Sequence, residues 1–282
     1  MSPSPPQQQS PIAWIDGRWG RPAELSVPLT DRGLQLADGL FETVLVEAGR
    51  PQRLDEHLQR WRQGAALLAM AEPPDQAWLT PLIEEAIARA GLAHSGSGAL
   101  RLAWTRGDNH SRGIELPADS STASPRFWLQ LTAITPAFAP CTAIVSRHER
   151  RNADSRLSRC KTLAYAQAIQ ARHEARQAGV DEALLLSTDG SLCCGSTANL
   201  LVHRQGRWLT PAVASGCLAG VMRGRALELG LAAEARLEAD PQPEDRWLLI
   251  NSLGCRPLKA LNGDAQPHLS ASEAEAFWRR LL

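Results

Sequence analysis

Apolar residues recur along the chain with two spacings, one typical of helices and the other typical of strands. In residues 54–71 they follow helical spacing through Leu58, Trp61, Ala65 and Leu68, which predicts an amphipathic helix with Asp55 as its N-cap. Further helices are expected at 76–91, at 162–178, from about Gly220, and at 271–281. Strand patterns cover 42–48, 98–105, 127–133, 142–147, 182–187, 198–203, 207–209 and 246–251. This mixture predicts an α+β fold.

Turn signals divide the chain. Asp16-Gly17 predicts a hairpin over 13–19, and Pro136 and Pro140 indicate a crossing between two lobes. We therefore expect three parts: a disordered tail at 1–11, a smaller α/β lobe at 12–135 and a larger lobe at 136–282.

Charge and hydropathy narrow the functional classes. Thirty basic residues balance thirty acidic ones, so no global field favours nucleic acid or an anionic membrane. No apolar run approaches the roughly 18 residues of a membrane helix. The start MSPSPPQQQS lacks the basic and apolar segments of a secretory signal, so we expect a cytoplasmic protein.

Cysteine usage indicates neither a metal site nor a disulfide framework. The six cysteines at 141, 160, 193, 194, 217 and 255 include no C-x-x-C pair. We expect most of them to be buried, reduced thiols in a cytosolic chain of this size.

Lys161 is the lysine with the most informative surroundings. Lys161 and Lys259 are the two lysines among the thirty basic residues, and the others are arginines. An amine can lose its proton and condense with an aldehyde cofactor, which a guanidinium cannot do. On this evidence alone, an ordinary surface lysine is the alternative.

Ordered motifs around Lys161 resemble those of the class IV pyridoxal-phosphate enzymes. The segments are Asp31-Arg-Gly, Asp38-Gly-Leu-Phe41-Glu, His57-Leu-Gln-Arg60, Arg159-Cys-Lys161-Thr-Leu-Ala-Tyr165, Asp181-Glu-Ala-Leu-Leu-Leu, Asp189-Gly, Gly195-Ser-Thr-Ala-Asn199-Leu and Leu218-Ala-Gly220-Val-Met-Arg223. The match runs from about residue 13 to residue 260. It implies the two-lobed fold of branched-chain and D-amino acid aminotransferases, with pyridoxal 5'-phosphate in the inter-lobe cleft, and a homodimer.

The resemblance also implies residue roles. Lys161 would bind the cofactor aldehyde, and Tyr165 would hydrogen-bond the phenolic oxygen. Leu218 would lie against the pyridine ring, and Asn199 matches a cofactor-binding asparagine. The phosphate ligands would be the Arg60 side chain, the helix-start amides of Gly220, Val221 and Met222, and donors of Asn251 and Ser252. Taken singly, an exposed helix arginine, a plain helix start and a core tyrosine are alternatives.

Position 194 departs from the family pattern. Most members place a glutamate five residues before the matched asparagine, where it pairs with the pyridinium nitrogen, whereas this chain has Cys194. A thiol is a poor ion-pair partner unless ionised. We therefore expect a less firmly protonated ring nitrogen and a weaker electron sink.

Two reactions remain open, together with a non-catalytic scaffold. A lyase would convert 4-amino-4-deoxychorismate to 4-aminobenzoate and pyruvate, a step of folate biosynthesis; an aminotransferase would act on D-amino or branched-chain acids. The segment from Asn251 to Pro257 resembles lyase members, and Cys194 favours a reaction driven by aromatisation. The loop 105–113 is also similar to theirs, so Arg106 and Arg112 would meet the carboxylates of the small-molecule substrate, although a solvated loop is equally consistent.

Overall fold

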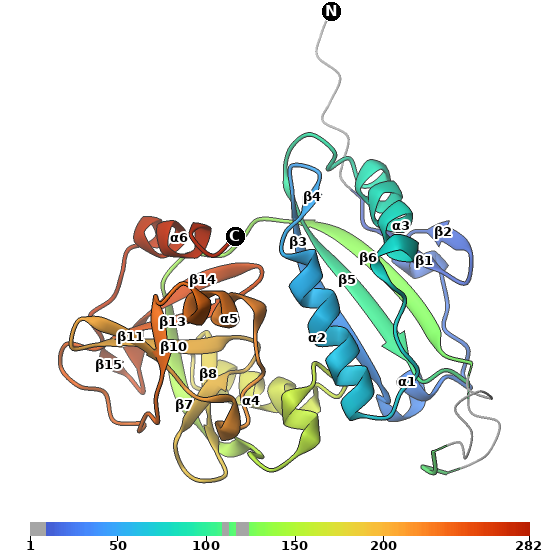
Figure 1. Ribbon diagram of the computed structural model, residues 1–282. Coiled ribbons are helices and arrows are strands. Elements are labelled where there is room, and N and C mark those ends of the chain that lie inside the picture. Colours follow the sequence, from blue (N-terminus) through green and yellow to red (C-terminus); the bar gives the residue numbers. More distant parts are fainter. Residues whose placement is uncertain (1–9, 109–112, 117–123) are drawn as a thin grey trace, which may run out of the picture. The chain divides into compact units, whose positions relative to one another are not determined.

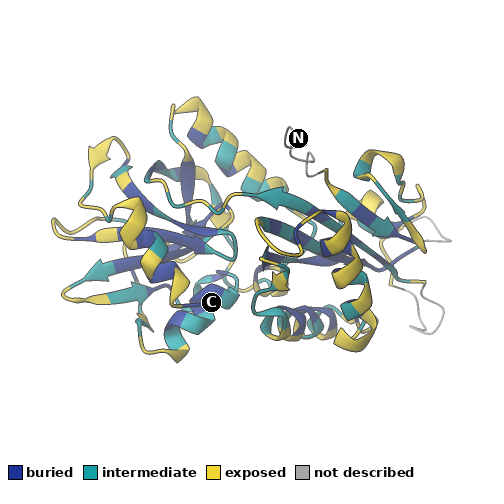
Figure 2. Ribbon diagram, turned by 90° about the horizontal axis from the view of Figure 1, so that it is seen from above, coloured by how far each residue is buried: buried dark blue, intermediate teal, exposed yellow. Residues whose placement is uncertain are grey.

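The computed structural model describes residues 10–108, 113–116 and 124–282. The chain divides into two compact units, the first ending at Thr135 and the second beginning at Pro136. Residues 1–9 of the expected tail, and Arg112, lie outside the described residues. In both units the strands carry most of the buried residues, while the helices expose one side (Figure 2).

An antiparallel sheet of six strands forms the first unit, in the order β2-β1-β6-β5-β3-β4 (Figure 1). Its strands are β1 (Ile12–Ile15), β2 (Arg18–Gly20), β3 (Gly39–Glu47), β4 (Arg50–Pro51), β5 (Ser97–Thr105) and β6 (Arg126–Ile134). The expected hairpin is confirmed, because β1 and β2 pair around a turn at Asp16-Gly17 whose residues both have positive φ.

Two long helices cover one face of this sheet, and a third helix is short. They are α2 (Leu54–Leu67), α3 (Gln76–Arg89) and α1 (Arg32–Leu36). Leu58, Trp61 and Ala65 are buried, so the apolar stripe predicted from their spacing faces the core, whereas Leu68 follows the end of α2 and is half-buried. The N-cap prediction was wrong: Arg53 precedes the helix in a left-handed conformation, and Asp55 lies in the first turn, where its charge complements the helix dipole.

The second unit contains a mixed sheet whose pairings close into a ring. Its strands are β7 (Cys141–Arg151), β8 (Glu182–Ser187), β9 (Leu192–Gly195), β10 (Asn199–Arg204), β11 (Arg207–Thr210), β12 (Ala232–Glu234), β13 (Arg246–Asn251), β14 (Gly254–Leu261) and β15 (Asp264–Ala265). Strand β9 pairs with both β8 and β10, so the path β10-β13-β14-β7-β8-β9 returns to β10. The pair that closes this ring is Asn199 opposite Cys194.

Three helices complete the second unit: α4 (Ala166–Gln177), α5 (Val221–Glu228) and α6 (Ala271–Arg279). Ala171 and Ala175 of α4 are fully buried near β8, and Trp278 of α6 is buried near β14. The expected helix at 162–178 begins only at Ala166, so Lys161 precedes it in an irregular segment. No helix within the described residues is long and apolar enough to cross a membrane.

Candidate active site

Lys161 and Tyr165 form a polar pair at the start of α4. The Nζ of Lys161 donates a hydrogen bond to the Tyr165 hydroxyl oxygen at 3.1 Å, and both side chains are half-buried. A short 3-10 helix, Arg156–Arg159, precedes Lys161, and Tyr165 is the residue before the first turn of α4. The three intervening residues thus bring an amine and a phenol together in a partly solvated setting suited to proton exchange.

The segment before Lys161 contacts a second turn of the same unit. Gly216 has a φ of +90°, and a Cβ there would lie 3.1 Å from the Asn152 carbonyl oxygen. Arg151, the last residue of β7, donates from Nε to the Gly216 carbonyl and from Nη2 to the Ser158 carbonyl, both at 3.2 Å. The turn that leads to Leu218 and the segment that leads to Lys161 are therefore joined.

Asn199 connects the ring closure to that same turn. Its Nδ2 donates to the Leu218 carbonyl at 2.9 Å, and its Oδ1 lies where a side chain on Gly220 would be. A Cβ on Gly220 would be 1.9 Å from this oxygen, so the close approach requires glycine. Cys194, Asn199, Leu218 and Gly220, all predicted as cofactor-binding residues, therefore lie in one continuous set of contacts.

Helix α5 begins immediately after Gly220 with an uncapped N-terminus. Gly220 is the N-cap and no side chain caps the helix. The first amides of any helix lack intrahelical partners and favour an anion. Because the Met222 side chain is buried, its backbone N–H is the group suited to such a ligand. The glycine cradle and the amides of Val221 and Met222 fit a phosphate group.

Asn251 shapes the adjoining β13–β14 turn through its side chain. Its Nδ2 donates to the Thr197 carbonyl at 3.3 Å, while its Oδ1 accepts from the Leu253 amide at 2.8 Å. Ser252 lies at the tip of that turn. The structure therefore gives the Asn251 side chain a role in holding the turn, and the phosphate-binding roles of Asn251 and Ser252 stay predictions.

Cys194 lies in a buried cluster that is mostly apolar. Ala183, Leu185, Cys193 and Cys217 belong to the same cluster. A hydrogen bond with Cys194, together with burial, raises the pKa of the Cys193 thiol, so Cys193 remains protonated. All six cysteines are free and buried, as predicted.

Glu182 lies beside Gly195 and Ser196, which follow Cys194, and its carboxylate already has hydrogen-bond partners. Glu182 accepts hydrogen bonds from the Ser196 amide and from Arg172 of α4, which also donates to the Ser196 hydroxyl. The Glu182 side chain is buried. Glu182 is therefore engaged by Arg172 and Ser196, while position 194 itself supplies a thiol.

In the first unit, Arg60 belongs to a buried triad. Its Nε donates to Glu42 at 2.8 Å, and Glu42 also contacts the Nδ1 of His57 at 2.7 Å. Burial raises the pKa of Glu42, but the charge of Arg60 and the hydrogen bonds from His57 and Arg60 lower it by more. The resulting pKa is about 2. Glu42 therefore holds the guanidinium in one orientation, and the phosphate-binding role of Arg60 stays a prediction.

Arg106 is engaged by protein groups on three sides. Its Nε donates to Asp38 at 2.8 Å, and its two Nη atoms donate to the carbonyls of Ala69 and Leu68, at 2.8 Å and 3.0 Å. These carbonyls follow α2, where a cation is favourable. Arg106 is buried and three of its five N–H groups are engaged by the protein, so its role in binding a substrate carboxylate stays a prediction.

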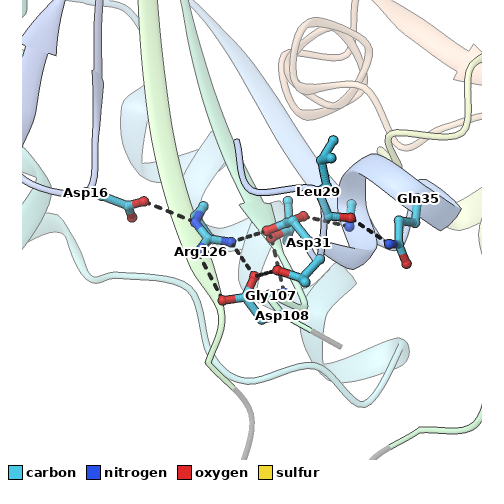
Figure 3. A network of polar contacts seen from close by, with 10 residues as sticks. Asp16, Leu29, Asp31, Gln35, Gly107, Asp108 and Arg126 are labelled. Carbon is cyan, nitrogen blue, oxygen red and sulfur yellow. Dashed lines mark hydrogen bonds and ion pairs between the residues drawn. The ribbon is translucent and has the colours of Figure 1, made fainter. Parts of the chain in front are cut away.

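Arg126 is the centre of a network of ion pairs that includes Asp108, close to the expected substrate loop in sequence (Figure 3). Its guanidinium donates to Asp31 at 2.6 Å, to Asp108 at 3.1 Å and to Asp16 at 3.2 Å. Gly107 packs so closely on Ser124 that a Cβ would lie 1.7 Å from the Ser124 carbonyl oxygen. The pattern of apolar residues gave no indication of this role for Arg126.

Comparisons with known proteins identify the family of the chain. The model of the family described as "Amino-transferase class IV" matches residues 39–261. The chain belongs to this family. Members use pyridoxal phosphate, so the predicted family, α+β fold and cofactor are confirmed.

Individual relatives differ in their reactions. The structure of 4-amino-4-deoxychorismate lyase from Pseudomonas aeruginosa is 30% identical with a TM-score of 0.74, and the match covers 95% of this chain and 98% of that one. A bifunctional aminodeoxychorismate lyase / D-amino acid transaminase of Mycobacterium tuberculosis is 28% identical over 69% of this chain and 67% of its own length. The branched-chain-amino-acid aminotransferase-like protein 2 of Arabidopsis thaliana is 28% identical over 79% of this chain, which spans 40% of that longer protein.

Proposed function

We propose that this pyridoxal-phosphate enzyme is a lyase that converts 4-amino-4-deoxychorismate to 4-aminobenzoate and pyruvate. The observation that carries the choice of reaction is the residue at position 194, a cysteine in a buried, mostly apolar cluster where most family members place a glutamate. The similarity to the Pseudomonas aeruginosa lyase over nearly the full length of both chains supports the same choice.

The residues of the second unit would hold the cofactor at two ends. Lys161 supplies the amine for the aldehyde, and the amides of Val221 and Met222, with the Ser252 hydroxyl, supply donors for the phosphate. When bound, the cofactor links to the substrate amine and withdraws electrons from the carbon that carries it. Arg60 stays a predicted phosphate ligand by resemblance.

Lys161 would move one proton. As a neutral amine it removes the proton from ring carbon C4 of the substrate, and the C–O bond to the enolpyruvyl group then breaks as the ring becomes aromatic. The ammonium of Lys161 returns a proton to the departing three-carbon unit, which leaves as pyruvate. Tyr165, in contact with Nζ at 3.1 Å, orients the amine and exchanges a hydrogen bond with it as its charge changes.

The thiol at position 194 suits this reaction better than transamination. Aromatisation drives the lyase step, so little charge has to be stored on the pyridine ring. Transamination stores charge there and benefits from a carboxylate that keeps the ring nitrogen protonated. A cysteine at this position supplies no carboxylate for that purpose.

Two assays on the same holoprotein separate the reactions. Pyruvate release from 4-amino-4-deoxychorismate, followed with a coupled lactate dehydrogenase, should occur without added keto acid. Amine exchange between D-alanine and 2-oxoglutarate should be much slower. Fast keto-acid-dependent exchange without pyruvate release from the chorismate derivative would contradict the proposal. D-Amino acid transamination is the second candidate because the Mycobacterium tuberculosis relative is named for both activities.

Assembly and location follow from the resemblance and the sequence. We propose a homodimer in the cytoplasm that acts on a small-molecule substrate. Sedimentation equilibrium at micromolar concentration should give twice the mass of one 30.6 kDa chain. A monomer under those conditions would contradict the proposed assembly.

A further inference from the structure

The side chain of Arg151 joins two segments that come from distant parts of the sequence. One segment ends in Ser158, three residues before Lys161, and the other contains Gly216, which leads to the α5 N-terminus. The Ser158 hydroxyl reinforces this junction by donating to the Asn152 carbonyl at 2.7 Å. Arg151 therefore links the segment before Lys161 to the turn that leads to the start of α5.

Arginine is the residue type that this junction requires. A planar guanidinium holds Nε and Nη2 at a fixed angle, so it can bind two carbonyl oxygens at once. The main chain of Arg151 is also held in place, because the Thr188 amide donates a hydrogen bond to the Arg151 carbonyl at 2.9 Å. A lysine at this place carries the same charge but has no rigid fork.

We propose that Arg151 is a positioning residue that sets the distance between Lys161 and the phosphate-binding start of α5. The inference rests on the proposed cofactor site and deepens it. A ligand held at both ends depends on that distance, whereas a ligand held at Lys161 alone does not. Arg151 should therefore matter for pyridoxal phosphate and not for pyridoxal, which has the aldehyde but no phosphate.

The test compares these two aldehydes on the apoprotein. Arg151→Lys should raise the Kd for pyridoxal phosphate about tenfold, equal to about 1.4 kcal/mol. The Kd for pyridoxal should change by less than about twofold. Arg204→Lys is the matched control, because Arg204 also uses Nε and Nη2, on Asp245, outside the proposed site.

A second, milder variant guards against loss of folding. Ser158→Ala removes the bond to the Asn152 carbonyl without changing the charge, and it should raise the Kd for pyridoxal phosphate alone, by about threefold. Denaturation of each apoprotein shows whether the fold is kept. If Arg151→Lys does not fold, Ser158→Ala decides.

Each result has one meaning. A selective loss of pyridoxal phosphate affinity supports the proposal. An equal loss for both aldehydes shows that Arg151 only stabilises the unit, and no loss for either shows that the junction is irrelevant; both overturn it. If the selective loss occurs but the protein releases no pyruvate from 4-amino-4-deoxychorismate, the proposed reaction fails while this inference stands. If the wild-type protein binds neither aldehyde, the proposed cofactor site itself fails.

Discussion

Gly220 offers a steric test of the candidate site, because its neighbour leaves no room for a side chain. In Gly220→Ala, the new Cβ would lie 1.9 Å from Oδ1 of Asn199 and 3.1 Å from its Cγ. The backbone itself accepts alanine, since Gly220 has φ −67° and ψ 141°. The substitution therefore acts through the Asn199 amide and not through the backbone.

The expected loss combines three effects. Moving the Asn199 amide breaks its 2.9 Å bond to the Leu218 carbonyl, and an unsatisfied buried partner costs about 1–3 kcal/mol. Crowding of the surrounding contacts adds about 1–3 kcal/mol. The lower entropy of the unfolded chain offsets about 0.4–1 kcal/mol. We expect a net decrease of about 2–4 kcal/mol in the free energy of unfolding.

Gly224→Ala provides the control in the same helix. Gly224 lies inside α5, and apart from its chain neighbours and the helix's own backbone nothing lies within 4 Å of an added Cβ, so alanine there should stabilise by about 0.5–1 kcal/mol. Urea denaturation of the two apoproteins measures the difference. Titration with pyridoxal phosphate should show weaker binding only for Gly220→Ala.

The double variant with Asn199→Ala identifies the cause. Without the amide, alanine at 220 meets no clash, so the second substitution should be nearly neutral, and the cycle should show a coupling of about 2 kcal/mol or more. Additive losses, or a Gly220→Ala protein as stable as Gly224→Ala, would refute the account of this turn.

Three further predictions concern individual side chains. Cys194→Glu should increase protonation of the ring nitrogen, seen as a changed spectrum of the bound cofactor and more amine exchange with a keto acid; an unchanged spectrum would place position 194 away from that nitrogen. Arg106→Met should lower the free energy of unfolding by about 3 kcal/mol because Asp38 and two carbonyls lose a buried cation; an unchanged stability with a higher KM would assign Arg106 to the substrate instead. The pKa of Glu42 is about 2 in the folded protein and near 4.5 when unfolded, so its stabilisation, on the order of 3 kcal/mol, should be complete above pH 4.5 and lost as the pH falls toward 2; Glu42→Gln should abolish that part of the acid dependence, and a pH profile identical to the wild type would contradict it.

Long elements with a strong period were predictable, whereas short or interrupted ones were not. The helix of Leu58 and Trp61 and the strands 98–105 and 127–133 agree with α2, β5 and β6 within a few residues. Strand β14 was missed because Pro257 interrupts its pattern. The structure accommodates this proline because the parallel pairing with β7 begins only at Leu258.

Other misses have similar local causes. Strand β9 is buried throughout and carries two cysteines, so it shows no alternation of apolar and polar residues. Helix α1 has five residues, too few for a helical period. Both elements are held by tertiary contacts rather than by local preference.

Predicting the site from sequence depended on motifs, and the motifs did not reveal how its parts are held. The chemical types of Lys161, Tyr165 and Gly220 carry information that a pattern can show. Arg151 instead binds backbone carbonyls 7 and 65 residues away, which any residue type provides. Such partners become visible only in the folded chain.

Reduction of the purified holoprotein with borohydride, followed by peptide mass mapping, tests the central claim most directly. The account predicts that a reduced pyridoxyl phosphate group is attached to the peptide that contains Lys161, and that Lys161→Ala carries none. Attachment at Lys259, the one other lysine of the chain, or no attachment at all, would contradict it.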